Sequence, residues 1–165
     1  MSPLNCPYSK NINEIMTTST QVQMEVSRRV AGWVQTYADT ITKNYREYHI
    51  RTLKGNLSGN YPEYAREQLD EIENGTANLM KFKVKTGKKY YKIVQMNFDT
   101  FQDRNEYREG SVHAFVDKQT GQVYKPATWQ APAKHVRYDL RIIREREFLF
   151  NPNNTGWAGG YLYLR

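Results

Sequence analysis

The sequence predicts an α+β fold in which a long N-terminal amphipathic helix and a short second helix pack on an antiparallel β-sheet. Three observations support it: apolar residues recur with the helical period before residue 50, turn formers interrupt the pattern twice before residue 76, and apolar and charged residues alternate strictly after residue 79. Helices followed by a run of strands are typical of α+β domains. A chain of 165 residues suits one domain, since domains commonly contain about 100–150 residues.

The predicted organisation is an arm followed by one domain. Residues 1–18 predict a flexible arm, because prolines and polar residues dominate this stretch near a terminus. Residues 19–165 form the single α+β domain, with a helical hairpin at 19–75 and the sheet-forming part at 79–165.

The long helix follows the arm. Thr18 with Gln21, or Thr20 with Gln23, offers a capping box at its start. Its apolar residues then recur at steps of three and four over about six turns. They are Val26, Val30, Trp33, Tyr37, Ile41, Tyr45 and Tyr48. Such a stripe rich in Tyr and Trp is more often part of a core than a ligand site, and the alternative is a seam between copies of the chain.

A second, short helix is predicted after the turn formers of residues 53–62. Pro62 suits the first helical position, and Asn74-Gly75 ends the helix. Residues 61–80 carry five acidic and one basic residue, so the outer face of this helix is acidic.

Strands are predicted from residue 79 onward. In residues 79–85, Phe82 and Val84 alternate with lysines, and residues 89–96 continue as a second strand after a turn at 86–88. A looser acidic stretch follows at residues 99–109. A second hairpin joins residues 111–116 to residues 122–125.

The C-terminal part contains a long proline-bounded loop and two further elements. Residues 138–150 fit either a short helix or, over 148–150, a strand. Residues 161–164 predict a last strand after Gly159-Gly160.

Composition excludes several classes of site. Cys6 is the only cysteine, so the chain has no disulfide framework, and its histidine and cysteine spacing predicts no metal site. No glycine-rich phosphate cradle precedes a helix, so we expect no cofactor. We expect no signal peptide and no membrane span, since no run approaches about 20 apolar residues. The expected location is the cytoplasm.

The catalytic inventory is short, and we lean towards a protein that is not an enzyme. Ser111, His113 and Asp117 are a conceivable triad on one predicted strand. At about 3.3 Å per residue along a strand, these three residues would span about 20 Å. This distance is too long for direct proton transfer between their side chains. His113 or His135 as a general base is the enzymatic alternative.

Two cationic surfaces are the candidate binding sites. The net charge is +7, and clustered charge attracts polyanions more effectively than diffuse charge. The first surface is the first hairpin, with Lys81, Lys83, Lys85, Lys88 and Lys89, extended by Lys92. The second surface is the loop VYKPATWQAPAKHVRY (123–138), with Lys125, Trp129, Lys134, His135 and Arg137. Pro126 and Pro132 stiffen this loop.

Each surface has a structural alternative. The first three lysines repel one another along the strand, and we favour the preceding acidic helix as the compensating charge over an external polyanion. In the second surface, a Trp beside cations can stack a base while the cations meet phosphate. Alternatively, Trp129 pins the loop onto the sheet.

Residues 110–140 contain GSVHAFVD, a TG hairpin, VYKPATW, PAK and RYDL, and residues 157–165 read WAGGYLYLR. This pattern resembles a segment of small uncharacterised bacteriophage proteins. The resemblance leaves the long helix outside. It implies a viral source, with host cytoplasm or virion as the location, and it implies no activity.

The sequence therefore predicts a non-enzymatic phage accessory protein that binds nucleic acid or a nucleotide-like anion through the basic and aromatic loop. The alternative is a virion, host-takeover or defence-inhibitor protein that acts through protein–protein contacts and self-assembly.

Overall fold

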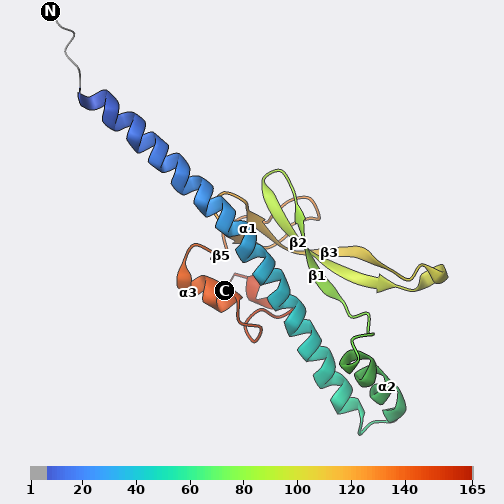
Figure 1. The fold of residues 1–165 in the computed structure, drawn as a ribbon. Helices are drawn as coiled ribbons and strands as arrows, with labels where there is room; N and C mark the ends of the chain where they lie inside the picture. Colours follow the sequence, from blue (N-terminus) through green and yellow to red (C-terminus); the bar gives the residue numbers. More distant parts are fainter. Residues whose placement is uncertain (1–6, 165) are drawn as a thin grey trace, which may run out of the picture.

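The computed structural model describes the backbone of residues 7–164 and the side chains of residue 16 and residues 18–164. Figure 1 shows one long helix, α1 (Pro7–Asn56), running past an antiparallel sheet, with a short helix α2 (Pro62–Glu73) beside its C-terminal end. This architecture confirms the predicted α+β class.

Helix α1 begins at Pro7, well before the predicted start at residue 19. Residues 7–18 of the expected arm therefore have a helical backbone, and residues 1–6 lie outside the described part. Proline is favoured in the first helical turn, where its missing N–H is not needed. Thr20 is inside the helix, because its hydroxyl donates to the Met16 carbonyl at 2.9 Å, so the predicted capping boxes do not mark the helix start.

The middle of the predicted apolar stripe of α1 faces the core. Val30, Tyr37 and Ile41 are fully buried, and so are Val34 and Ala38, which the predicted stripe did not include. Tyr48, at the end of the predicted stripe, is 40% exposed. The buried residues pack against the sheet and against buried leucines from the C-terminal part of the chain, namely Leu140, Leu149 and Leu162. The middle of the stripe is therefore occupied within this chain and does not form a seam between copies.

Helix α2 completes the predicted helical hairpin. Its Ala65 and Ile72 are buried with Leu53 near the C-terminal end of α1, and Leu69 packs against this small cluster. The acidic residues lie on the other side of α2. The hairpin thus places an acidic helix at one end of α1.

The sheet has five antiparallel strands in the order β1-β2-β3-β4-β5. They are β1 (Lys81–Thr86), β2 (Tyr90–Asp99), β3 (Glu106–Asp117), β4 (Gln122–Tyr124) and β5 (Tyr138–Asp139). The acidic stretch after residue 99 is not a loose connection as expected. Residues 106–109 pair with β2, so β2 and β3 form one long hairpin that ends at the 3₁₀ turn Phe101–Asp103.

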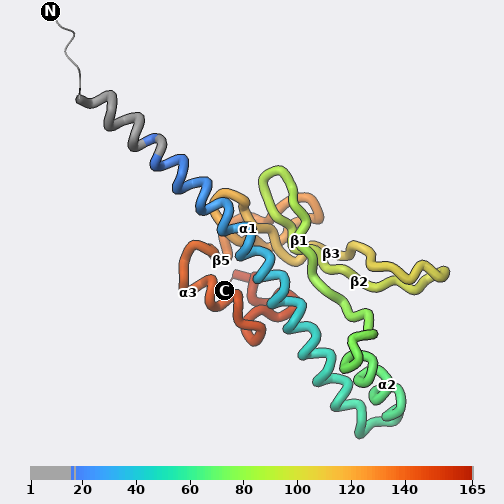
Figure 2. Tube along the Cα trace, viewed as in Figure 1, coloured from blue at the N-terminus to red at the C-terminus, as the bar shows by residue number. Residues whose placement is uncertain are grey.

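The C-terminal part corrects one strand prediction and resolves an ambiguity. Residues 138–150 contain the short strand β5 and then helix α3 (Ile143–Leu149). Residues 160–162 form a 3₁₀ helix instead of the predicted strand. Leu162 is buried, and its carbonyl accepts from Arg137 Nε at 2.7 Å, so tertiary contacts override the local strand propensity of this segment. Figure 2 shows these last residues beside the middle of α1.

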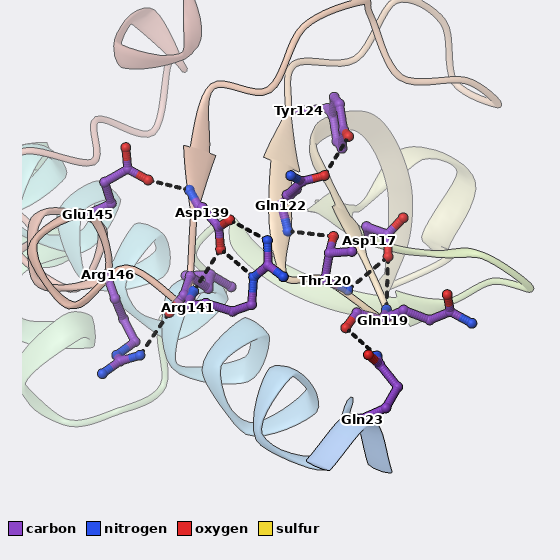
Figure 3. A network of polar contacts seen from close by, with 11 residues as sticks. Gln23, Asp117, Gln119, Thr120, Gln122, Tyr124, Asp139, Arg141, Glu145 and Arg146 are labelled. Carbon is purple, nitrogen blue, oxygen red and sulfur yellow. Dashed lines mark hydrogen bonds and ion pairs between the residues drawn. The ribbon is translucent and has the colours of Figure 1, made fainter. Parts of the chain in front are cut away.

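Side-chain hydrogen bonds fix the corner where β3, β4, β5 and α3 meet (Figure 3). Asp117 Oδ1 accepts from the N–H groups of Gln119 and Thr120, which closes the turn before β4. Glu145 accepts from the Asp139 N–H at 2.6 Å, which ties α3 to β5. Gln23 of α1 donates to the Gln119 carbonyl at 3.0 Å, so the corner is also fastened to the long helix.

The turn at this corner predicts a measurable stability difference between two glycines. Gly121 has a φ of +73°, and a Cβ there would lie 3.2 Å from Val30 Cγ2 and 3.4 Å from Leu140 Cβ. Gly75 has a similar φ of +74° with no atom within 4 Å of the same position. We expect Gly75→Ala to lower the free energy of unfolding by about 1 kcal/mol through backbone strain alone, and Gly121→Ala to lower it clearly more.

Urea denaturation of both variants and the parent measures this difference. Equal losses would show that Val30 and Leu140 do not pack against the turn as the structure describes.

Candidate nucleic-acid interface

The face of the sheet turned away from α1, here called the outer face, carries the lysines of the first predicted surface. In β1 and β2, Lys85 lies directly opposite Lys92, and the neighbouring pair is Val84 and Ile93. Ile93 belongs to the core with α1. Because successive side chains of a strand point to opposite faces, the lysines next to this pair point to the outer face. The lysines of this face are Lys81, Lys83, Lys85 and Lys92.

Trp129 joins this lysine group from the proline-bounded loop. Lys92 Nζ lies 4.3 Å and Lys85 Nζ 5.1 Å from the centroid of the Trp129 ring. The indole Nε1–H donates to the Gly110 carbonyl at 2.9 Å, and Lys92 Nζ donates to the Trp129 carbonyl at 3.0 Å. The loop thus crosses back to β2 and β3 and holds Trp129 in place. We call these four lysines and Trp129 the lysine–Trp129 face.

The Trp129 side chain is anchored at its edge but keeps a substantial exposed area. The residue is 38% exposed. A cation within about 6 Å of an indole centroid is attracted to the ring by about 0.5–1 kcal/mol at an exposed site. The interface therefore presents a rigid aromatic surface beside two ammonium groups.

The acidic helix does not provide the charge compensation that we favoured. Lys85 Nζ instead donates to both carboxylate oxygens of Glu109 of β3, at 2.9 and 3.1 Å. Lys81 Nζ lies 4.0 Å from the Tyr107 ring centroid. The register places Glu109 on the same face as these lysines, because Glu109 lies opposite Met96 and Met96 lies opposite Lys81. Helix α2 packs on the end of α1 instead.

The residues predicted for the loop surface have separate surroundings. Arg137 is committed to backbone groups, since it donates to the carbonyls of Leu162, Lys134 and His135. Lys125 Nζ lies 3.9 Å from the Tyr163 ring centroid. Lys134 and His135 are exposed, and His135 has a positive φ of +73°. Among these residues, we therefore assign Arg137 to holding the loop and the C-terminal segment together.

Of the hairpin residues, Lys88 and Lys89 occupy the exposed turn between β1 and β2. The Lys89 carbonyl accepts from the Lys118 N–H at 3.0 Å, so a third lysine lies beside the turn. In the sequence, the hairpin and the loop are two separate surfaces. In the structure, Trp129 contacts Lys85 and Lys92. This contact depends on the register of the strands, so no local sequence pattern predicts it.

The conceivable triad of Ser111, His113 and Asp117 is not assembled. His113 Nε2 shares a 2.7 Å hydrogen bond with the Tyr161 hydroxyl, which in turn bonds the Tyr37 hydroxyl of α1. Asp117 is used in the turn before β4, as described above. His113 is thus part of a buried polar chain that connects β3, the C-terminal 3₁₀ helix and α1.

Burial dominates the ionisation of this polar chain. It lowers the pKa of His113 to about 4, opposed by a backbone hydrogen bond at Trp157. Burial also raises the pKa of Tyr37 and of Tyr161. The groups that face the imidazole are the Tyr161 hydroxyl, the Phe82 ring and the Trp157 backbone. The imidazole is therefore neutral in the folded protein at neutral pH.

The fold and the interface define an α+β protein with a two-helix hairpin and a five-stranded antiparallel sheet whose outer face is cationic and aromatic. The chain belongs to the DUF7717 family, described as a family of unknown function, and the match covers residues 14–164. Neither the curated proteins nor the solved structures give a match to this chain. Within residues 7–164, no helix has the length and apolar character needed to cross a membrane.

The buried His113 predicts a pH dependence of stability. The imidazole titrates near about 6.5 in an unfolded chain and at about 4 in the folded chain. Between these values the unfolded state binds more protons, so the free energy of unfolding is highest above about pH 6.5 and falls as the pH drops towards 4. The loss expected from this group is about 3 kcal/mol.

Urea denaturation at several pH values compares the parent with His113→Gln, which cannot titrate, and with His135→Gln as an exposed control. The slope between about pH 4 and 6.5 should decrease only in His113→Gln. An unchanged slope in that variant would assign the pH dependence to other groups.

Proposed function

We propose that this protein is a non-enzymatic phage accessory protein whose lysine–Trp129 face binds single-stranded nucleic acid. The observation that supports this proposal is the exposed indole of Trp129, which two lysine ammonium groups approach within 4.3 and 5.1 Å of the ring centroid. A planar group that stacks on the indole would bring its phosphate next to these cations. Its viral source is an expectation from the sequence resemblance.

The physical argument favours a single strand over a duplex. Stacking on an aromatic side chain requires an unpaired base with an accessible face, and such stacking contributes about 1–3 kcal/mol per base. Lys83 lies between Lys81 and Lys85 on β1, is exposed, and has Val94 of β2 directly opposite. A row of lysines along one strand can follow a phosphate backbone, while Trp129 takes a base.

The ordinary explanation of these lysines is protection of the sheet edge. β1 is an edge strand, and lysines on an edge discourage pairing with other chains. This explanation accounts for Lys83 but not for Trp129, which lies over β2 and β3 and not at the edge. The hydrogen bond that anchors the indole explains the position of the ring but not its exposed area. Binding to a nucleic acid accounts for both features.

Trp129→Ala should weaken binding of a labelled single-stranded oligonucleotide about tenfold, because stacking is lost. Trp129→Phe is the matched control, since it keeps an aromatic ring and removes only the hydrogen bond to Gly110, so it should retain most of the affinity. Fluorescence anisotropy at low salt measures both. The salt dependence should not change in Trp129→Ala, because no cation is removed.

Lys83→Gln should weaken binding and also reduce the salt dependence. For a single strand, each neutralised phosphate contributes about 0.7 to the slope of log K against log salt, so the slope should fall by about that amount. Lys54→Gln, the same charge change at the exposed C-terminal end of α1, should alter neither quantity.

Two results would contradict the proposal. One is no binding of single-stranded DNA or RNA at low salt. The other is equal loss in Lys83→Gln and Lys54→Gln together with no loss in Trp129→Ala, which would indicate attraction to the net charge alone. Titration with a mononucleotide tests whether one stacked base and its phosphate are sufficient.

A further inference from the structure

A groove with an apolar floor lies between the first half of α1 and helix α3. Its volume is about 630 Å³. Its apolar lining consists of Val22, Val26 and Trp33 from α1 and Ile143 from α3. Val22 is 58% and Ile143 62% exposed, although both are large apolar side chains. Exposed apolar residues that meet in one groove mark an interaction surface more often than scattered ones do.

Arginines form the rim of this groove. Arg29, Arg141 and Arg146 line it together with one carboxylate, that of Glu25. Arg146 donates to the Leu140 carbonyl at 2.8 Å, and its guanidinium carbon lies 4.4 Å from the Trp33 ring centroid. Arg141 is paired with Asp139 at 2.7 Å. Figure 3 shows Arg141, just before α3, and Arg146, within α3, with the hydrogen bonds that hold them.

Arg29 is also anchored, since its Nε donates to Glu25 at 2.9 Å. Arg29 and Arg141 still face solvent. The side chain of Arg141 is 44% exposed and that of Arg29 is 62% exposed. Their internal contacts fix their positions and so reduce the entropy that a partner would have to remove on binding. The groove therefore suits an amphipathic segment with an aromatic or aliphatic anchor and carboxylates beside it.

Helix α2 has the complementary chemistry. It contains five acidic residues and one basic residue, Arg66. None of its carboxylates forms an ion pair with any of the side chains described for residues 16 and 18–164. Tyr64 is 61% exposed. It lies three residues before Glu67, and Glu63 lies four residues before Glu67, so one side of the helix offers an aromatic ring beside carboxylates.

α2 cannot reach the groove of its own chain. It packs against Leu53 near the end of α1, whereas the nearest groove residue on α1 is Trp33. Twenty residues of continuous helix separate these two positions, which corresponds to about 30 Å. Figure 1 shows α2 at the far end of α1 from its N-terminal half.

We propose that helix α2 of one copy docks in the groove between α1 and α3 of a second copy. Tyr64 enters the apolar floor, and the carboxylates of Glu63 and Glu67 meet the arginine rim. Because the two surfaces differ, the contact is head-to-tail, and it closes into a ring or extends into a filament. This proposal does not depend on nucleic-acid binding, because it uses neither the outer face of the sheet nor Trp129.

Two variants of the full chain test it. Ile143→Glu places a carboxylate in the groove and leaves α2 intact. The double variant Glu63→Lys, Glu67→Lys reverses the charge of α2 and leaves the groove intact. Sedimentation velocity over a range of concentrations should show oligomers for the parent and association weakened about tenfold or more for each variant. An equimolar mixture of the two variants should form a dimer and stop there, because only one intact groove and one intact α2 are available per pair.

Matched controls separate this result from general charge effects. The double variant Asp39→Lys, Glu106→Lys makes the same change in net charge at exposed positions outside both surfaces and should assemble like the parent. Circular dichroism confirms that all variants fold. A parent that is monomeric at every concentration would overturn the proposal, as would a parent oligomer that both variants retain, or a mixture of the two variants that stays monomeric.

Discussion

Burial of one stripe of α1 against the inner face of the sheet is the interaction on which the rest of the structure depends. The sheet alone has two short strands, β4 and β5, that pair through few residues. Val30, Tyr37 and Ile41 are fully buried, and each such side chain contributes about 1.5–3 kcal/mol by leaving water. The C-terminal leucines share this core, so the chain after β5 is held by α1 as much as by the sheet.

The same packing determines where function can lie. The inner face of the sheet is filled by α1, and its polar groups, among them His113 and Tyr161, are satisfied internally. Among the described residues, the surfaces open to partners include the outer face of the sheet, the groove between α1 and α3, and helix α2. The outer face and the groove rim carry lysines and arginines, whereas α2 is acidic.

Sequence patterns predicted those features that depend on local periodicity. The alternation around Phe82 and Val84 located β1, and the middle of the predicted stripe, from Val30 to Ile41, located the buried side of α1. Local patterns failed where tertiary contacts decide. Residues 161–164 have strand-forming side chains, yet Leu162 is buried and its carbonyl accepts from Arg137, which favours a 3₁₀ turn. Sequence patterns do not locate the start of α1, because Pro7 suits both an arm and the first turn of a helix.

The candidate interface shows the same limit more sharply. Trp129 was recognised from its prolines and neighbouring cations, but the cations that meet its ring come from Lys85 and Lys92. Their positions depend on the pairing of β1 with β2 and on the return of the loop to Gly110, neither of which composition reveals. Arg137 had the charge expected of a ligand-binding residue, yet its guanidinium is occupied by three backbone carbonyls. A cation contributes to recognition only when the fold leaves its hydrogen-bond donors available to a partner. In this protein, Lys83 on the exposed strand β1 meets that condition better than Arg137 in the loop.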